Sequence, residues 1–181
     1  EYEAWTGGIA SACGLAAGAP LPEPSAADYR SVVDAASELI LPELVPGSGQ
    51  FPGSEARAVQ DGRAYAVADI LAGRSAPAFL REPRRAMAAL NLSLALHTLV
   101  ALERAGLGPR TSVFTEGGFR RNGGYNAILA AALGEGRAFL TDIAEATAFG
   151  AAMTAAAALR GEAPDALGGL FEVDYRGVEP M

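Results

Sequence analysis

The sequence predicts an α/β domain, and two observations carry that prediction. The chain has 181 residues, of which half are hydrophobic and only 19% are charged, so its composition is globular and allows a sizeable core. From residue 83 onward, the spacing of apolar, β-branched and glycine residues indicates the order helix, strand, helix, strand, helix. Such alternation is typical of layered α/β domains.

The first half of the chain predicts a helix, a loop and a strand. Ser25 is the expected N-cap of a helix over residues 26–40, with Asp28 as its acidic capping partner. The stretch 42–55 is dense in Pro, Gly and Ser, which favours an irregular surface loop. Residues 64–71 contain several β-favourable side chains and predict a strand.

The second half carries the clearest elements. A helix over residues 83–104 begins with proline at its first position and stops before Gly106. Its apolar run, residues 86–102, is about one turn short of the roughly 20 residues that cross a bilayer, so we expect a buried core helix and no membrane contact. The other expected elements are a strand over 111–115, a helix over 122–133, a short strand over 137–140, a helix over 145–161 and weak strand character over 170–175.

Charge and cysteine content argue against a nucleic-acid-binding protein and against a disulfide-bonded one. The formal net charge is −7, all 14 basic residues are arginine, and they form no block large enough to predict nucleic-acid binding. Cys13 is the only cysteine, which excludes an intrachain disulfide and favours a reducing compartment, the cytoplasm.

Two glycine-containing motifs carry the chemistry. In FTEGGFRRNGGYNAILAAALG, residues 114–134, a strand ending at Thr115 is followed by a glycine pair and a helix that begins near Asn122. In this geometry free backbone N–H groups and the positive end of the helix dipole face the turn, where a nucleotide or phosphate can lie. The second motif, EATAFGAA, places Gly150 inside a helix, for close approach of a ligand or for tight packing. Each motif alone also fits an ordinary turn or packing contact.

Together the two motifs resemble the C-terminal domain of the FGGY carbohydrate kinases, with the right order and near the right spacing. The resemblance implies an actin-like ATPase domain of ribonuclease-H type, a mixed sheet with flanking helices. It implies that residues 1–181 are the C-terminal nucleotide-binding domain, and that the N-terminal sugar-binding domain, with the catalytic aspartate, is not present. Tyr2 and Trp5 are expected on the surface that faces that domain, and exposure of this surface predicts self-association into a homodimer.

The resemblance also assigns nucleotide contacts. It implies that adenosine of ATP is contacted by Gly118 and Asn122, that Gly117 shapes the same turn, and that a second glycine-led contact comes from Gly7 and Ser11. It assigns no catalytic residue and no metal ligand to this chain.

The implied function is transfer of the γ-phosphate of ATP, with Mg²⁺, to a hydroxyl of a small sugar, ketose or polyol. A domain that holds adenosine but lacks the base is expected to bind nucleotide without catalysing. Glu116 stands where the family has its first glycine, and Phe119 replaces a small residue. These departures leave open a non-catalytic actin-like binding or regulatory domain with a degenerate nucleotide pocket. A third alternative is an Ala-rich interaction domain whose glycines serve helix packing.

The remaining candidates each have a structural explanation. His97 is the only histidine and is expected to be a core or partly buried polar residue. Glu145 in a helix's first turn has a favourable interaction with the helix dipole, which we prefer to a role with Mg²⁺ or ribose. Asp142 is interpreted as a cap or turn residue, whereas Arg120 and Arg121 fit phosphate contacts and solvated charges equally well.

Overall fold

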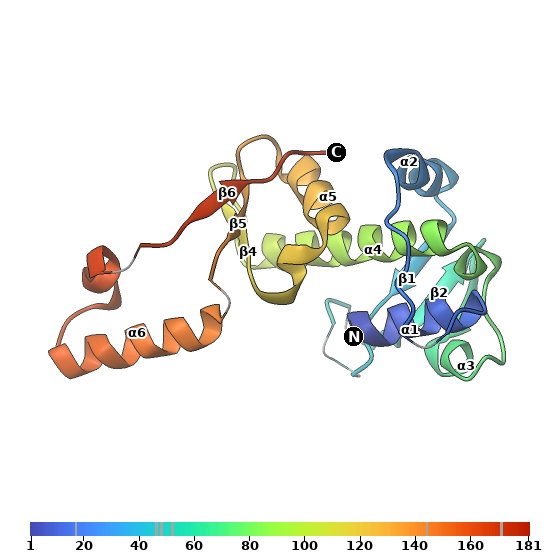
Figure 1. Ribbon diagram of the computed structural model, residues 1–181, viewed down its shortest axis with the longest axis horizontal. Helices are drawn as coiled ribbons and strands as arrows, with labels where there is room; N and C mark the ends of the chain where they lie inside the picture. Colours follow the sequence, from blue (N-terminus) through green and yellow to red (C-terminus); the bar gives the residue numbers. More distant parts are fainter. Residues whose placement is uncertain (17, 46, 48, 52, 144, 171) are drawn as a thin grey trace. The chain divides into compact units, whose positions relative to one another are not determined.

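The computed structural model describes residues 1–16, 18–45, 47, 49–51, 53–143, 145–170 and 172–181. Within it the chain forms two units, Glu1–Gly108 (unit 1) and Pro109–Met181 (unit 2), and each has a three-stranded sheet with helices (Figure 1). The predicted mixed α/β class is therefore confirmed. Neither small sheet by itself establishes the ribonuclease-H-type arrangement that the resemblance implies.

Unit 1 is built around one antiparallel sheet and one long helix. Its elements in chain order are α1 (Tyr2–Ala12), α2 (Ala26–Ala35), β1 (Glu38–Leu41), β2 (Arg57–Gln60), β3 (Arg63–Ala66), α3 (Val67–Leu71), the 3₁₀ helix η1 (Ala78–Arg81) and α4 (Pro83–Arg104). The sheet order is β1-β2-β3, and both pairs are antiparallel. Helix α4 contacts α1, α2 and β1, so it forms the centre of this unit's core.

Helix α4 has the bounds that the sequence predicted, Pro83–Arg104. By length and composition alone it passes for a membrane span, with a mean hydropathy of 1.5 over 18 residues, but 44% of that window is buried inside the protein. The core helix of a soluble protein passes the same test, so this finding gives no independent support for a membrane span.

Trp5 is not a surface residue, contrary to expectation. Its side chain is fully buried, and its indole Nε1 donates a hydrogen bond to the carbonyl oxygen of Pro42 at 3.1 Å. Ring burial with the N–H satisfied is the common state of a core tryptophan. Trp5 therefore belongs to the core of unit 1.

Two predicted elements of unit 1 change type partway. The predicted capping box is confirmed, since Ser25 and Asp28 bond reciprocally, but α2 ends at Ala35, because Ala36 adopts a left-handed conformation with φ of 49°. Ile40 instead lies in β1, paired with Ala58 of β2. Its backbone N–H donates to the Ser93 hydroxyl of α4 at 2.9 Å.

The strand predicted over residues 64–71 is also shorter than expected. Strand β3 ends at Ala66, and helix α3 follows directly. The turn between β2 and β3 is Asp61-Gly62, and both residues have positive φ, as two-residue hairpin turns of type I′ require. In the loop predicted over 42–55, the described residues form no helix or strand, while Pro46, Ser48 and Pro52 lie outside the described residues.

Unit 2 contains a β–α–β arrangement followed by a return strand. Its elements are β4 (Val113–Thr115), the 3₁₀ helix η2 (Gly117–Arg121), α5 (Gly123–Leu133), β5 (Ala138–Thr141), α6 (Ala146–Arg160), the 3₁₀ helix η3 (Pro164–Leu170) and β6 (Tyr175–Gly177). The sheet order is β4-β5-β6, with β4 and β5 parallel and β5 and β6 antiparallel. The alternation predicted from residue 83 onward is confirmed.

The C-terminal strand lies later in the chain than predicted. Strand β6 begins at Tyr175, whereas the expected strand character covered 170–175, of which Phe171 lies outside the described residues. Thr141 pairs with Tyr175, and this pairing brings the ends of β5 and β6 together.

Helix α6 covers the second predicted motif. Only Ala157 is buried among its described side chains, and a Cβ placed on Gly150 would meet no atom within 4 Å. Tight packing of the helix against a neighbour therefore does not explain this glycine among the residues that the structure describes.

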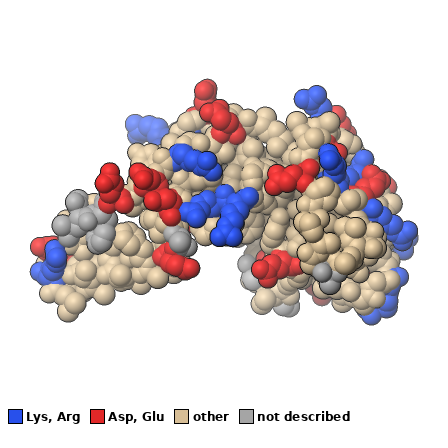
Figure 2. All heavy atoms as spheres, in the orientation of Figure 1, with Lys and Arg blue, Asp and Glu red and all other residues tan. Residues whose placement is uncertain are grey.

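Acidic and basic side chains are interspersed over the face shown in Figure 2. The blue groups there are small and separated by tan or red atoms over most of that face.

Candidate functional site

The glycine turn of unit 2 has the strand–turn–helix geometry that the sequence predicted. Strand β4 ends at Thr115, Glu116 is extended, and the chain then turns through η2 into α5. Gly117 has φ of +64°, a left-handed conformation that glycine adopts without steric cost. A glycine at this position therefore lets the backbone turn between β4 and α5.

Gly118 has a different reason to be glycine. Its φ is not in the left-handed range, and a Cβ built on it would meet no atom within 4 Å. Neither backbone conformation nor packing inside the described residues requires a glycine here. The space beside Gly118 is open, so the absence of a side chain leaves room for a bound group.

Asn122 is the N-cap of α5. Its side-chain oxygen accepts a hydrogen bond from the backbone N–H of Tyr125 at 2.9 Å. This bond satisfies one of the N–H groups that lack partners at a helix start. Asn122 therefore has a structural role in addition to the nucleotide contact that the resemblance implies.

Asn126, which the sequence analysis did not single out, holds the turn to the helix. Its buried side-chain amide donates to the carbonyl oxygens of Phe119 and Asn122, each at 2.8 Å. It lies four residues after Asn122, one helical turn along, and that spacing was the available signal.

Phe119 and Glu116, the two departures from the family pattern, differ in their surroundings at the turn. The Phe119 ring packs against the Tyr125 ring, with centroids 4.9 Å apart and planes inclined by 53°. Glu116 is exposed. Phe119 is thus engaged with a residue of α5, about one-third exposed.

A cavity of about 660 Å³ adjoins this turn within unit 2. It is bounded by the end of η2, the first residue of α5, the C-terminal end of β5 and the start of β6. Arg120 and Arg121 line it, and the Arg120 guanidinium donates to the Thr141 carbonyl oxygen at 2.9 Å. Neither Glu116 nor Phe119 belongs to its lining.

Thr141, one of the residues that line this cavity, has a buried polar atom without a partner in the described part of the chain. The residue lines the cavity and is only 5% exposed, and its hydroxyl Oγ1 is buried with no hydrogen-bond partner among the described residues. A buried polar group without a partner costs about 1–3 kcal/mol, so such groups are uncommon in folded proteins. No local sequence pattern points to this residue, because its surroundings depend on the pairing of β5 with β6.

The second predicted contact lies in unit 1. Gly7 and Ser11 stand one helical turn apart on α1, and a Cβ on Gly7 would meet no atom within 4 Å. The structure therefore gathers Gly117, Gly118 and Asn122 into one turn of unit 2, and Gly7 and Ser11 onto one helix of unit 1.

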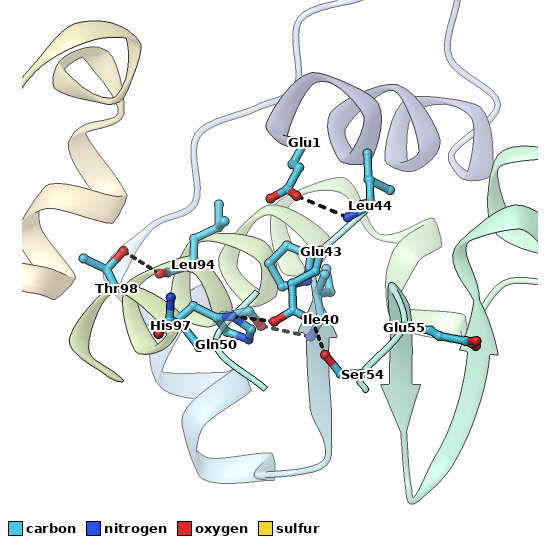
Figure 3. Close-up of polar contacts among 12 residues, drawn as sticks. Glu1, Ile40, Glu43, Leu44, Gln50, Ser54, Glu55, Leu94, His97 and Thr98 are labelled. Carbon is cyan, nitrogen blue, oxygen red and sulfur yellow. Dashed lines mark hydrogen bonds and ion pairs between the residues drawn. The ribbon is translucent and has the colours of Figure 1, made fainter. Parts of the chain in front are cut away.

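Unit 1 also holds a buried polar cluster that contains the only histidine (Figure 3). Glu43 is 4% exposed, its Oε1 lies 3.5 Å from His97 Nδ1, and its Oε2 accepts a hydrogen bond from the Ser54 hydroxyl. The Phe51 ring meets the His97 ring edge-on, at 5.2 Å between centroids. Burial lowers the pKa of His97, and the nearby Glu43 opposes this effect. His97 is thus partly buried and polar, as predicted.

Three other residues singled out in the sequence have the following surroundings. The Cys13 thiol donates to the Leu80 carbonyl oxygen at 3.3 Å, and burial raises the pKa of that thiol. Glu145 is the N-cap residue of α6 without a side-chain capping bond. The Asp142 backbone N–H donates to the Asp174 carbonyl oxygen at 3.1 Å, which continues the pairing of β5 with β6, and both residues line the cavity.

A comparison with known protein families shows which family the chain belongs to. Residues 9–164 match the family described as "Carbohydrate kinase FGGY, C-terminal domain". The chain belongs to the FGGY carbohydrate kinase family. No match is found among curated proteins or among solved structures.

The match covers most of the residues that the resemblance singled out. The FGGY domain includes the turn with Gly117, Gly118 and Asn122, and it includes Ser11, whereas Gly7 lies just before its first matched residue. Because FGGY proteins are carbohydrate kinases, the chain is a member of a phosphotransferase family.

Proposed function

We propose that this chain is the nucleotide-binding half of an ATP-dependent carbohydrate kinase. In the proposed reaction the γ-phosphate of ATP passes to a hydroxyl of a small sugar, ketose or polyol. The chain holds the adenosine part of ATP at Gly118 and Asn122, and the sugar and the general base belong to an N-terminal domain. The chain alone then binds nucleotide without catalysing, since phosphoryl transfer needs the acceptor positioned in line.

The observation that carries this proposal is the open space beside Gly118 at the junction of a parallel strand and a helix. Gly117 makes the turn possible through its positive φ, whereas Gly118 has no such need and no neighbour where its Cβ would be. A glycine with open space in front of it, next to the positive end of α5, suits close approach of a nucleotide to bare backbone.

Magnesium fits the proposal as part of the nucleotide. Among the residues that the structure describes, no group of three His, Cys, Asp or Glu side chains is arranged to hold a metal ion. Mg²⁺ is commonly held by substrate phosphates with one or two carboxylates, so MgATP brings most of its own ligands. When bound, the ion would neutralise charge on the phosphates.

Calorimetric titration of the chain with MgADP tests this function. The wild-type chain is expected to bind with one-to-one stoichiometry, and Gly118→Val is expected to abolish the heat while leaving the melting temperature unchanged. The matched control is Gly168→Val, another exposed glycine whose Cβ would meet no atom within 4 Å. Equal binding by both variants and the wild type would rule out the proposed contact.

The non-catalytic alternative makes a different prediction in the same titration. A domain whose pocket is closed by Glu116 and Phe119 binds no nucleotide until both are replaced. Glu116→Gly combined with Phe119→Ala would then create affinity that the wild-type chain lacks.

A further inference from the structure

The cavity of unit 2 is lined by residues other than Gly118 and Asn122. We propose that it binds a phosphate group of a small molecule, held by Arg120, Arg121 and Thr141. This assignment does not depend on the nucleotide contact at Gly118, because it uses other residues and another surface of the turn.

The lining of the cavity is positive in an otherwise acidic protein. Three arginines, Arg120, Arg121 and Arg176, face it together with two aspartates, Asp142 and Asp174. The chain as a whole has a formal charge of −7, so this excess of cations is local. None of these five side chains forms an ion pair with another described residue, which leaves the arginine charges for a ligand.

Arg120 is already held in position. Its Nη1 donates to the Thr141 carbonyl oxygen at 2.9 Å, a bond that joins η2 to the end of β5. A guanidinium has five N–H donors in a fixed plane, so this one bond leaves others for the cavity. An arginine fixed in this way loses less side-chain freedom when it binds an anion.

Thr141 supplies the independent sign of a ligand. Thr141 lines the cavity and is 95% covered, and its buried Oγ1 has no hydrogen-bond partner among the described residues. A hydroxyl in that state is satisfied when a ligand oxygen accepts a hydrogen bond from it. Phosphate oxygens accept from hydroxyl, guanidinium and backbone N–H groups alike.

The first residue of α5 adds a backbone donor. Gly123 lines the cavity, and no atom lies within 4 Å of where its Cβ would be. Its N–H belongs to the helix start, where backbone donors have no partner inside the helix and the dipole favours an anion. A glycine at position 123 therefore leaves the backbone bare where it borders the cavity.

Titration with inorganic pyrophosphate at constant ionic strength tests the proposal on the 181-residue chain. Arg121→Gln and Thr141→Val are each expected to weaken pyrophosphate binding about tenfold, the effect of losing one hydrogen bond to a charged group. Arg110→Gln is the matched control, since it removes the same charge from an exposed arginine of unit 2 outside the cavity lining. Thr141→Ser keeps the hydroxyl and is expected to retain binding.

Two results would overturn the phosphate site. One is a folded wild-type chain that does not bind millimolar pyrophosphate. The other is binding that Arg121→Gln and Thr141→Val weaken no more than Arg110→Gln does. Arg121 is exposed, so Arg121→Gln is expected to fold. This variant therefore tests the proposal even if Thr141→Val does not fold.

Parallel titrations with adenosine and ADP separate the two sources of the phosphate. If the cavity takes the phosphates of the bound nucleotide, pyrophosphate competes with ADP, and Arg121→Gln weakens ADP but not adenosine. If it takes a separate phosphorylated molecule, pyrophosphate and ADP bind together, and Arg121→Gln leaves ADP unchanged. If pyrophosphate binds but neither adenosine nor ADP does, the result would contradict the proposed nucleotide contact and leave the phosphate site standing.

Discussion

The side-chain oxygen of Asn122 accepts a hydrogen bond from the backbone N–H of Tyr125 at 2.9 Å. The same residue is the one to which the FGGY resemblance assigns a contact with adenosine. One asparagine thus begins helix α5 and is proposed to bind the ligand at that helix's start, and the two roles can be separated by substitution.

Asn122→Ala is expected to lower the free energy of unfolding by about 1 kcal/mol, because it removes the N-cap. Asn122→Asp keeps a capping oxygen and is expected to retain stability, yet it loses the amide donor and adds a negative charge. MgADP affinity is therefore expected to fall in both variants, while urea denaturation separates them. An Asn122→Asp chain with wild-type affinity for MgADP would assign Asn122 a capping role only.

Alanine substitutions at Gly117 and at Gly118 are expected to differ in their effect on the free energy of unfolding. Gly117→Ala forces a Cβ into the left-handed region and is expected to destabilise by about 1–2 kcal/mol. Gly118→Ala meets open space and is expected to change the unfolding free energy by less than about 0.5 kcal/mol. Thermal denaturation of both proteins checks this contrast, and equal losses would mean that Gly118 is needed for folding.

Protonation of His97 is expected to destabilise the protein below neutral pH. Its pKa in the folded chain lies below the unfolded value of about 6.5, so the unfolded state takes up the proton first. The stability that His97 contributes is then fully present above about pH 6.5 and is lost as the pH falls through the lower folded pKa. Urea denaturation between pH 7.5 and 5.5 measures the slope.

The control for that experiment is His97→Gln. Because His97 is the only histidine, the variant is expected to lose most of the slope in that range. Glu43 faces His97 at 3.5 Å and Glu1 also favours the charged form, so stability that rises on acidification would show that these carboxylates outweigh burial.

The pair of Arg85 and Glu38 is expected to stabilise unit 1. Arg85 Nε donates to both Glu38 carboxylate oxygens, at 2.9 and 2.8 Å, and the Glu38 side chain is only 3% exposed. Arg85→Met leaves that carboxylate without its partner and is expected to cost about 2 kcal/mol. Arg84→Met, which removes the neighbouring exposed arginine, is expected to cost less than about 0.5 kcal/mol by chemical denaturation. Similar costs for the two variants would contradict this account of the pair.

Local signals predicted the parts of the fold that local physics determines. The Ser25 cap, the bounds of α4 and the strand–turn–helix at Gly117 all depend on residues within a few positions of one another. Long-range pairing determined the rest. Ile40 lies in a strand and not in the predicted helix, because it pairs with β2 and its N–H donates a hydrogen bond to Ser93, 53 positions away.

The candidate site divides in the same way. The family motif identified Gly118 and Asn122, whose neighbours in space are their neighbours in sequence. It did not identify Thr141 or Asp174, because they meet only when β5 pairs with β6 across more than 30 residues. Asn126 falls between these cases, since its spacing from Asn122 was visible but its two bonds to the turn were not.

The most direct test of the nucleotide-binding claim is amide NMR of the isotope-labelled chain during titration with MgADP. We predict that shifts concentrate on Gly117, Gly118 and Asn122 and the first turn of α5, and that Gly118→Val abolishes them while the spectrum stays well dispersed. A well-dispersed wild-type spectrum that saturating MgADP leaves unchanged at this turn would contradict the claim that these residues hold nucleotide.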